Sequence, residues 1–207
     1  MRITQKYIRN YRPRFYAWLT KLLYASSNVH FGKELRCDSI PKIMIDPGAE
    51  LRIGDKVEFR RNVELRVHQE SKMEIANNVR IDRGVRLLST NKARIELAEG
   101  VRIGLYSVFN GGDSIKVGAK SLISGFVYLQ TSMHGFKDRN MEVQAQGYEH
   151  APIELEKDCW LGTHVVVLPG VRLGKGVVVG SNAVVNRSVE DYKVIGGIPA
   201  KEIKERS

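Results

Sequence analysis

The C-terminal third of the chain carries an apolar position every six residues. Aliphatic side chains keep this interval without a slip at Leu155, Leu161, Val167, Leu173, Val179 and Val185. A second series of small or apolar residues keeps step with it at Cys159, Val165, Val171, Val177, Ala183 and Val189. A period of six fits neither a helix nor an alternating strand, so it predicts a hexapeptide coil of short strands and corners. Three such sides close a triangular coil of about 18 residues with the aliphatic series inside.

The same interval begins at Ile53, where surplus residues interrupt it. Its groups of three are Ile53, Phe59 and Leu65; Ile75, Ile81 and Leu87; Leu97, Ile103 and Phe109; and Val117, Ile123 and Leu129. Each surplus follows the third position of a group, so the loops are predicted to project from one corner. Insertions on one face of a solenoid commonly form its binding face, and we expect function there.

The longest surplus, residues 131–154, reads TSMHGFKDRNMEVQAQGYEHAPIE. A structureless excursion of this length is usually functional. It contains His134 near its start and Glu149 and His150 near its end. Asn110 falls one coil below at the same corner. Because neighbouring strands stack about 4.8 Å apart, Asn110 and the root of this loop are predicted to be neighbours.

Residues 1–27 hold cations and aromatic residues but no acid; the cations are Arg2, Lys6, Arg9, Arg12, Arg14 and Lys21. Pro13 suits a helix start, which predicts a short helix from about Arg14 to Ala25. One interpretation is a cap that covers the open end of the solenoid. The other is contact with an anionic membrane surface, and the two can coexist.

Composition narrows the class of protein. A chain of 207 residues with 19 glycines and 8% aromatic residues suits one domain that turns corners repeatedly. The two cysteines, Cys37 and Cys159, do not make a disulfide framework, and neither a signal peptide nor a membrane-spanning run is evident. A reducing cytoplasm is therefore expected. The net charge of +10 comes without a nucleic-acid-binding module, so it favours anionic ligands such as nucleotide phosphates or lipid headgroups over nucleic acid.

The period of six, the single large loop with its histidine, and the closing phrase WLGTHVVVLPGVRLGKGVVVGSNAVVNRSV…GGIPAKEI resemble the left-handed parallel β-helix acyltransferases. The nearest branch includes maltose, nodulation-factor and streptogramin acetyltransferases and polysaccharide O-acetyltransferases. The resemblance covers about residues 40–205. It implies an all-β, left-handed parallel β-helix, which we place over 41–203, between the helical N-terminal segment at 1–40, where the resemblance offers no motif, and a tail at 204–207. It also implies acetyl-CoA as donor and a homotrimer with active sites between neighbouring subunits.

The resemblance assigns catalytic roles to three residues. TSMH matches the family's catalytic segment, which makes His134 the general base that takes a proton from the acceptor hydroxyl, a task suited to an imidazole near neutral pH. Asn110 matches an asparagine that places the acceptor or the tetrahedral intermediate; alternatively, it satisfies its own turn. Glu149 corresponds to an acid that orients the histidine or the acceptor, with Asp113 and Asp138 as competitors. The four other histidines lack the motif and are expected to be structural or exposed: His30, His68, His150 and His164.

Further matches concern the donor. Gly162 and Thr163 belong to a phrase whose backbone groups bond the pantetheine arm in relatives, and Gly180 and Ser181 follow one coil later at the same corner. The alternative for these glycines is simple corner geometry. Trp160 is predicted to point outward, either under the loop or into the groove. Cations near the nucleotide end would meet its phosphates; the matching positions there are Arg187, Pro199 and Lys201, while Lys204 and Arg206 add charge in the tail.

The preferred function is acetyl-CoA-dependent O-acetylation of a sugar hydroxyl in surface polysaccharide, O-antigen or capsule assembly, in the cytoplasm or at the inner membrane face. The loop sequence MHGFKDRN lacks the His-Pro-Leu of small-sugar acetyltransferases, which favours a glycan acceptor. Alternatives are N-acetylation of an amino sugar, acetylation of an antibiotic or serine, and a non-catalytic scaffold. Carbonic anhydrase chemistry would need three histidine ligands at coil corners, which the sequence does not place there, so no metal is expected.

Overall fold

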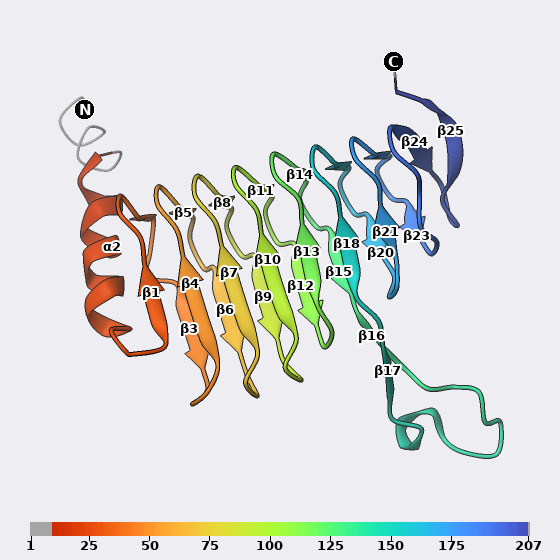
Figure 1. Cartoon of the computed structure of the whole chain (residues 1–207), viewed down its shortest axis with the longest axis horizontal. Coiled ribbons are helices and arrows are strands. Elements are labelled where there is room, and N and C mark those ends of the chain that lie inside the picture. The colour runs from red at the N-terminus through yellow and green to blue at the C-terminus, as the bar shows by residue number, and fades with distance from the viewer. Residues whose placement is uncertain (1–9, 207) are drawn as a thin grey trace.

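Three parallel β-sheets form the sides of a solenoid along the long axis of the molecule (Figure 1). The computed structural model describes residues 10–206. Sheet A contains β1 (Val29–Phe31), β4 (Glu50–Ile53), β7 (Lys72–Ile75), β10 (Arg94–Leu97), β13 (Ile115–Val117), β18 (Ile153–Leu155) and β21 (Arg172–Leu173). Sheet B contains β2 (Arg36–Cys37), β5 (Glu58–Phe59), β8 (Arg80–Ile81), β11 (Arg102–Ile103), β14 (Leu122–Ile123), β19 (Trp160–Leu161), β22 (Val178–Val179), β24 (Lys193–Gly196) and β25 (Lys201–Glu205). Sheet C contains β3 (Lys42–Ile45), β6 (Glu64–Val67), β9 (Arg86–Ser89), β12 (Val108–Gly111), β15 (Tyr128–Gln130), β20 (Val166–Val167) and β23 (Val184–Val185).

The strand register follows the period of six. In sheet A, Ile53 pairs with Ile75 and Ile75 with Leu97. In sheet C, Leu87 pairs with Phe109 and Phe109 with Leu129. The groups of three predicted from the sequence are therefore successive coils, and the predicted left-handed parallel β-helix fold is confirmed.

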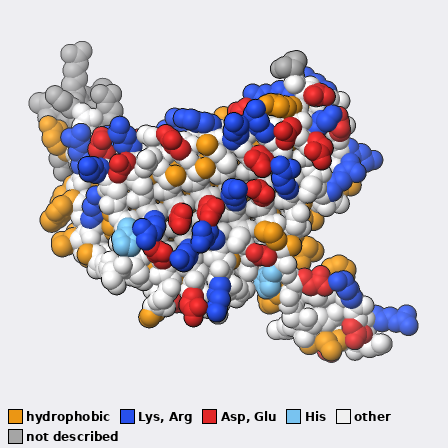
Figure 2. Space-filling model, viewed as in Figure 1, with side chains coloured by type: hydrophobic (Ala, Val, Ile, Leu, Met, Phe, Trp, Pro, Cys, Tyr) orange, Lys and Arg blue, Asp and Glu red, His pale blue; other side chains and the backbone are white. Residues whose placement is uncertain are grey.

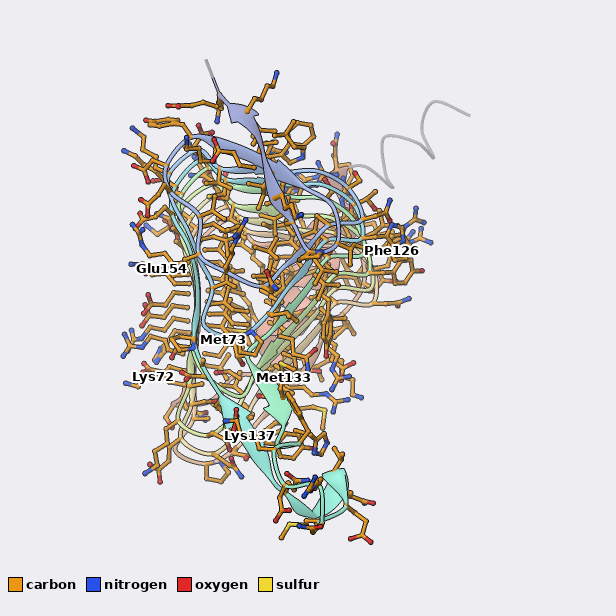
Figure 3. All side chains as sticks on the ribbon, turned by 90° about the vertical axis from the view of Figure 1, so that its right-hand side faces the viewer. Lys72, Met73, Phe126, Met133, Lys137 and Glu154 are labelled. Atoms are coloured by element: carbon orange, nitrogen blue, oxygen red, sulfur yellow. The ribbon has the colours of Figure 1, made fainter. Side chains whose placement is uncertain are left out.

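The core consists of the inward residues of each strand. Figure 3, which looks along the solenoid, shows Met73 pointing inward and its neighbour Lys72 pointing out. The largest fully buried side chains include Phe59, Phe109 and Leu51. This alternation is the one expected of short strands buried on one face.

Surplus residues leave the solenoid at the corner between sheets C and A, as predicted. They follow β6, β9, β12 and β15, and Figure 1 shows the resulting loops side by side along one edge. The longest was expected to be structureless, but it forms a hairpin of β16 (Ser132–His134) and β17 (Tyr148–His150) with a 3-10 turn, η1 (Val143–Ala145). Its antiparallel pairing satisfies backbone groups that a free loop would leave to water.

The N-terminal helix, α2 (Arg12–Leu23), packs on the first coil through β2, which is the position that the cap interpretation requires. Pro13 stands in its first turn, where the missing N–H costs nothing. Its buried residues are Pro13, Ala17 and Thr20, and the Tyr24 hydroxyl donates to the Pro41 carbonyl at 3.1 Å. The predicted cations Arg2, Lys6 and Arg9 lie outside the described residues.

The solenoid begins earlier than residue 41. Strands β1 and β2 pair with β4 and β5, so that Phe31 aligns with Ile53 and Cys37 with Phe59. The N-terminal segment therefore contributes most of a coil in addition to its helix. At the other end, β25 folds back antiparallel on β24, so Lys204 continues a strand. No helix within residues 10–206 is long and apolar enough to cross a membrane.

We predict that Leu87→Ala lowers the free energy of unfolding by about 2–5 kcal/mol, because Leu87 is fully buried between Leu65 and Phe109. The matched control is the next residue, Leu88, which lies on the outer face of the same strand and is half-buried. Its replacement by Ala is expected to cost less than about 1 kcal/mol. Urea denaturation followed by circular dichroism measures both. Equal losses would contradict the inward assignment.

Candidate functional site

Asn110 and the root of the hairpin are neighbours, as predicted. Both the backbone N–H and the hydroxyl of Thr131 donate to the Asn110 carbonyl, at 3.2 and 2.8 Å. The Ala151 N–H donates to the Thr131 carbonyl at 3.0 Å and closes the base of the loop. The hairpin is thus anchored to the coil below it.

His134 lies on the face of the hairpin that also carries Ser132, Tyr148 and His150. Directly opposite residues in an antiparallel pair share a face, and the register pairs Ser132 with His150 and His134 with Tyr148. The His134 side chain is exposed, and its ring centroid lies 4.1 Å from that of Tyr148. Within the part of the chain that the structure describes, no side chain hydrogen-bonds the His134 ring. Both ring nitrogens therefore remain available to a ligand.

Glu149 lies on the opposite face of the hairpin. It pairs with Met133 rather than His134, and its carboxylate is 2.6 Å from the Lys137 ammonium. Both side chains of this ion pair are exposed. The structure therefore does not bring the Glu149 carboxylate to the imidazole of His134.

The two competing acids are engaged locally. Asp113 accepts a hydrogen bond from the Ser114 N–H at 2.6 Å, and Asp138 accepts one from the Asn140 N–H at 2.9 Å. Neither carboxylate contacts His134 among the hydrogen bonds and ion pairs of residues 10–206. In one chain, the neighbour of the imidazole is therefore an aromatic ring rather than an acid.

The contacts around His134 were not predicted from the sequence. The Ser132 hydroxyl lies 2.8 Å from His150 Nδ1, and Ser132 is only 8% exposed. A side chain at Gly112 would overlap Ser132 Oγ and lie 2.9 Å from His150 Nδ1, so this glycine makes room for the pair. The sequence did contain a signal for this contact. Ser132 and His150 lie at equal distances from the middle of the loop, which is the spacing that an antiparallel hairpin requires.

The other histidines have the structural or exposed roles expected of them. His68 Nδ1 bonds Asp46 at 3.0 Å, and His30 lies 3.8 Å from Glu50. The bond from His68 lowers the pKa of Asp46. His164 stacks on Phe126 with a centroid distance of 4.9 Å. Over residues 10–206 there is no cluster of three or more side chains suited to hold a metal ion.

The outer face of sheet C changes character along the axis. On its first three strands it carries charged side chains such as Glu64, Arg66 and Arg86. On the later strands the outward residues carry no charge, and we call them the uncharged strip: Val108, Asn110, Tyr128, Gln130, Val166 and Val184. All six are half-buried. The Asn110 side-chain amide makes no hydrogen bond within the described range, so it is available on this strip.

The predicted donor residues lie at the corner between sheets B and C. The pairing of Leu161 with Val179 places Gly162 and Thr163 one coil from Gly180 and Ser181. A Cβ at Gly162 would come within 2.6 Å of the Ser181 nitrogen, so close stacking of the coils already requires this glycine. The corner-geometry interpretation therefore accounts for Gly162 without a ligand.

Backbone donors nevertheless remain at this corner. The Thr163 hydroxyl is used, because it donates to the Gly125 carbonyl at 2.8 Å. The backbone N–H groups of Thr163 and Ser181 donate to no group among residues 10–206. They form a short row along the axis, which is the arrangement that amide carbonyls of an extended ligand need.

Cations gather at the C-terminal end. A cavity of about 290 Å³ is lined by residues that include Arg187, Lys193 and Glu202. The hydrogen bond that Lys193 donates to the Glu202 carboxylate raises the pKa of Lys193. Arg187 and Lys201 enter no ion pair in the described chain. Pro199 is exposed in the turn before β25. Arg187 and Lys201 are thus available to bind phosphates.

The remaining candidates lie elsewhere. Trp160 is 51% exposed on the outer face of sheet B and lines a cavity of about 460 Å³ with Leu122 and Val178. Its indole N–H donates to the Ser124 hydroxyl at 3.3 Å, and Ser124 aligns with Gly162 one coil away, so Trp160 reaches the donor corner rather than the loop. Arg206 bonds Asp158 at 2.9 Å, whereas Lys204 lines the same cavity as Trp160.

The residues predicted to be catalytic and those predicted to bind the donor occupy different corners. Figure 3 shows Phe126 at the corner between sheets B and C, away from Met133 and Lys137 on the hairpin. The uncharged strip spans the face between them. A site that uses both groups must therefore cross this strip or combine residues of two copies of the chain.

Residues 152–187 match the family model described as "Bacterial transferase hexapeptide (six repeats)". This segment is therefore similar to the hexapeptide-repeat transferases. Among curated relatives of this hexapeptide-repeat protein, the putative lipopolysaccharide biosynthesis O-acetyl transferase WbbJ of Escherichia coli K12 is 37% identical over 100 residues, which cover 45% of this chain and 51% of WbbJ. The probable acetyltransferase Rv3034c of Mycobacterium tuberculosis is 34% identical over 104 residues, covering 50% and 35%. The chain thus spans about half the length of these relatives or less.

A point mutant of AntD, an N-acyltransferase from Bacillus cereus, has the same fold, with a TM-score of 0.64 and 22% identity over 92% of this chain and 89% of that one. That structure holds coenzyme A and dTDP-4-amino-4,6-dideoxyglucose.

We predict that neither thiol reacts in the folded hexapeptide-repeat protein. Burial raises the pKa of Cys37 to about 12 and that of Cys159 to about 11. Both are free and almost inaccessible, so at pH 8 alkylation by iodoacetamide should be at least about 100-fold slower than in the urea-unfolded chain. Mass spectrometry at timed intervals measures both rates. Rapid labelling of either native cysteine would contradict this and reopen a cysteine nucleophile.

Proposed function

We propose that the protein transfers an acetyl group from acetyl-CoA to a sugar hydroxyl of a glycan during surface-polysaccharide assembly. The observation that carries the proposal is the position of His134, exposed at one end of an uncharged strip whose other end offers free backbone donors. The WbbJ relative, named for lipopolysaccharide O-acetylation, supports the acceptor class at a higher identity than the N-acyltransferase AntD. The two buried thiols suit a reducing cytoplasm.

The reaction is direct transfer to the acceptor. A neutral nitrogen of His134 takes the proton from the sugar hydroxyl while the hydroxyl oxygen attacks the thioester carbonyl. The C–O bond forms, the C–S bond breaks, and the thiolate leaving group takes up the proton from the imidazolium. Tyr148 packs against the ring of His134 and limits its orientations. No covalent enzyme intermediate is needed.

Asn110 is the residue we assign to the developing oxyanion. Its amide is unbonded on the uncharged strip, one coil below the root of the hairpin. An amide donor of this kind typically contributes about 10²–10³-fold to the rate. Glu149 faces Lys137 in a single chain, so its role would require either rotation of the side chain or an acceptor that contacts the far face of the hairpin.

The donor would lie along the corner between sheets B and C. The N–H groups of Thr163 and Ser181 suit the amide carbonyls of the pantetheine arm. Arg187 and Lys201 suit the phosphates, because neither is neutralised within the described chain. Gly180 and Pro199 would line the path between them.

The site is proposed to lie between neighbouring copies in a homotrimer. His134 and the donor corner flank the two edges of the uncharged strip, and one copy can present the first while its neighbour presents the second. A strip of half-buried, uncharged side chains suits contact with another chain or a ligand better than contact with water.

We predict that acetyl-CoA releases thiol only with a glycan acceptor and only with His134 intact. His134→Ala should lower turnover about 10²–10⁴-fold and leave CoA affinity unchanged, since the imidazole acts on the acceptor. Thiol release is measured across nucleotide sugars, amino sugars and lipid-linked glycans. The matched control is His68→Ala, which removes a histidine held by Asp46 far from the hairpin and should keep full activity.

Each pattern of release has a distinct meaning. Release with amino sugars alone would replace O-acetylation by N-acetylation. Equal activity of wild type and His134→Ala would remove the general base. Absence of CoA binding by calorimetry would overturn the proposed activity as a whole.

We predict that two inactive variants restore activity when mixed. Ser181→Arg fills the donor corner from an exposed position, whereas His134→Ala removes the base. After co-refolding in equal amounts, about one quarter of the sites in a closed ring of identical copies combine an intact His134 with an intact Ser181. Thiol release should recover to about that fraction. No recovery, in mixed oligomers verified by differential tagging, would place the whole site in one chain.

A further inference from the structure

Helix α2 has two apolar faces, and only one of them is used by the fold. Its buried residues are Pro13, Ala17 and Thr20, which pack on the first coil. A second set recurs at intervals of three and four residues, and its members are 53–60% exposed: Phe15, Trp18 and Leu22. At 100° per residue, these two sets lie about 180° apart around the helix. We call the exposed set the outer face of α2.

The outer face looks away from the body of the protein. Figure 1 shows α2 lying across one end of the solenoid, roughly perpendicular to its long axis. Figure 2 shows hydrophobic side chains gathered at this end, with Lys and Arg beside them. Three large apolar residues on one exposed helix face need a covering partner more than scattered surface residues do.

The cations beside the outer face of α2 indicate which kind of partner could cover it. On the helical wheel, Arg14 and Lys21 flank one side of the outer face and Arg12 the other. Arg12 lies over the Tyr16 ring and Lys21 donates to the Gly32 carbonyl, while Arg14 has no ion pair inside the described range. Residues 1–27 contain six Lys and Arg and no acid. A second copy of the same face would bring like charges together, which is unfavourable without intervening acids.

We propose that the outer face of α2 docks on an anionic lipid bilayer, with Phe15, Trp18 and Leu22 entering the interface and the flanking cations contacting headgroups. Aromatic residues and cations arranged in this way are the standard composition of interfacial helices. The cap and membrane interpretations of this segment thus apply to opposite faces of one helix. The docking does not depend on the enzymatic activity.

Docking fixes the height of the hairpin above the lipid surface. Four strand-to-strand steps in sheet C separate β3, next to the helix, from β15, which leads into the hairpin. At about 4.8 Å per step, the root of the hairpin that carries His134 stands about 19 Å beyond the first coil. If the proposed function holds, the acceptor is a glycan carried by a lipid in the same membrane and long enough to reach that height.

The two tryptophans of the chain make the test direct. In Trp160→Phe, Trp18 is the sole fluorophore, and in Trp18→Phe it is Trp160 on sheet B. We expect the emission of Trp18 to shift to the blue with phosphatidylglycerol-containing vesicles and to stay unchanged with pure phosphatidylcholine. The emission of Trp160 should not move with either. Removal of one cation by Arg14→Gln should weaken co-sedimentation about fivefold, as should moderate salt.

A matched control distinguishes docking through this face from nonspecific binding through any exposed apolar residue. Leu122→Ala removes an exposed apolar residue of sheet B and should leave vesicle binding unchanged, whereas Leu22→Ala should weaken it. Equal shifts of both tryptophans, or equal binding to neutral vesicles, would overturn the proposal. A blue shift of Trp18 that grows with protein concentration and needs no vesicles would assign the face to a second copy instead. Failure of vesicle binding with full thiol release would overturn docking alone.

Discussion

The structure depends on the in-register stacking of short parallel strands. Each coil donates backbone hydrogen bonds to the next, as when the Gly162 N–H donates to the Val179 carbonyl, and each inward side chain rests on its counterpart one coil away. Because a strand of two to four residues is too short to be stable alone, every coil depends on its neighbours. The backbone ladder therefore fixes the spacing at which outward residues are presented, including those of the proposed site.

The period of six was sufficient to predict the core of the coils. Inward positions such as Ile75, Ile81 and Leu87 are buried. Burial requires apolar residues, so these recur at a fixed interval in the sequence. The first coil was not predicted because its inward residues are Phe31, Cys37 and Ile43, where a thiol interrupts the series of large apolar residues. The hairpin was not predicted either, because its two strands alternate with a period of two on either side of a turn, and this pattern leaves no interval of six.

The candidate site was predictable only in part. A motif placed His134 at the correct corner, and stacking of the coils placed Asn110 beside the root of the hairpin. The face on which each side chain of the hairpin lies depends on its register, and a shift of one residue would replace Tyr148 by Glu149 as the partner of His134. Likewise, a glycine is needed at Gly162 because Ser181 lies against it from one coil away. The residues next to Gly162 in the sequence do not reveal this contact.

The confinement of all surplus residues to one corner gives this architecture two independent dimensions. A longer or shorter excursion between sheets C and A alters how far the hairpin extends sideways, while β18 still pairs with β13 as though nothing intervened. Addition or loss of a whole coil instead moves the hairpin along the axis in increments of one strand spacing. Lateral reach and axial position can therefore evolve separately, and relatives with the same core could serve substrates of different depth and breadth by changing only one of them.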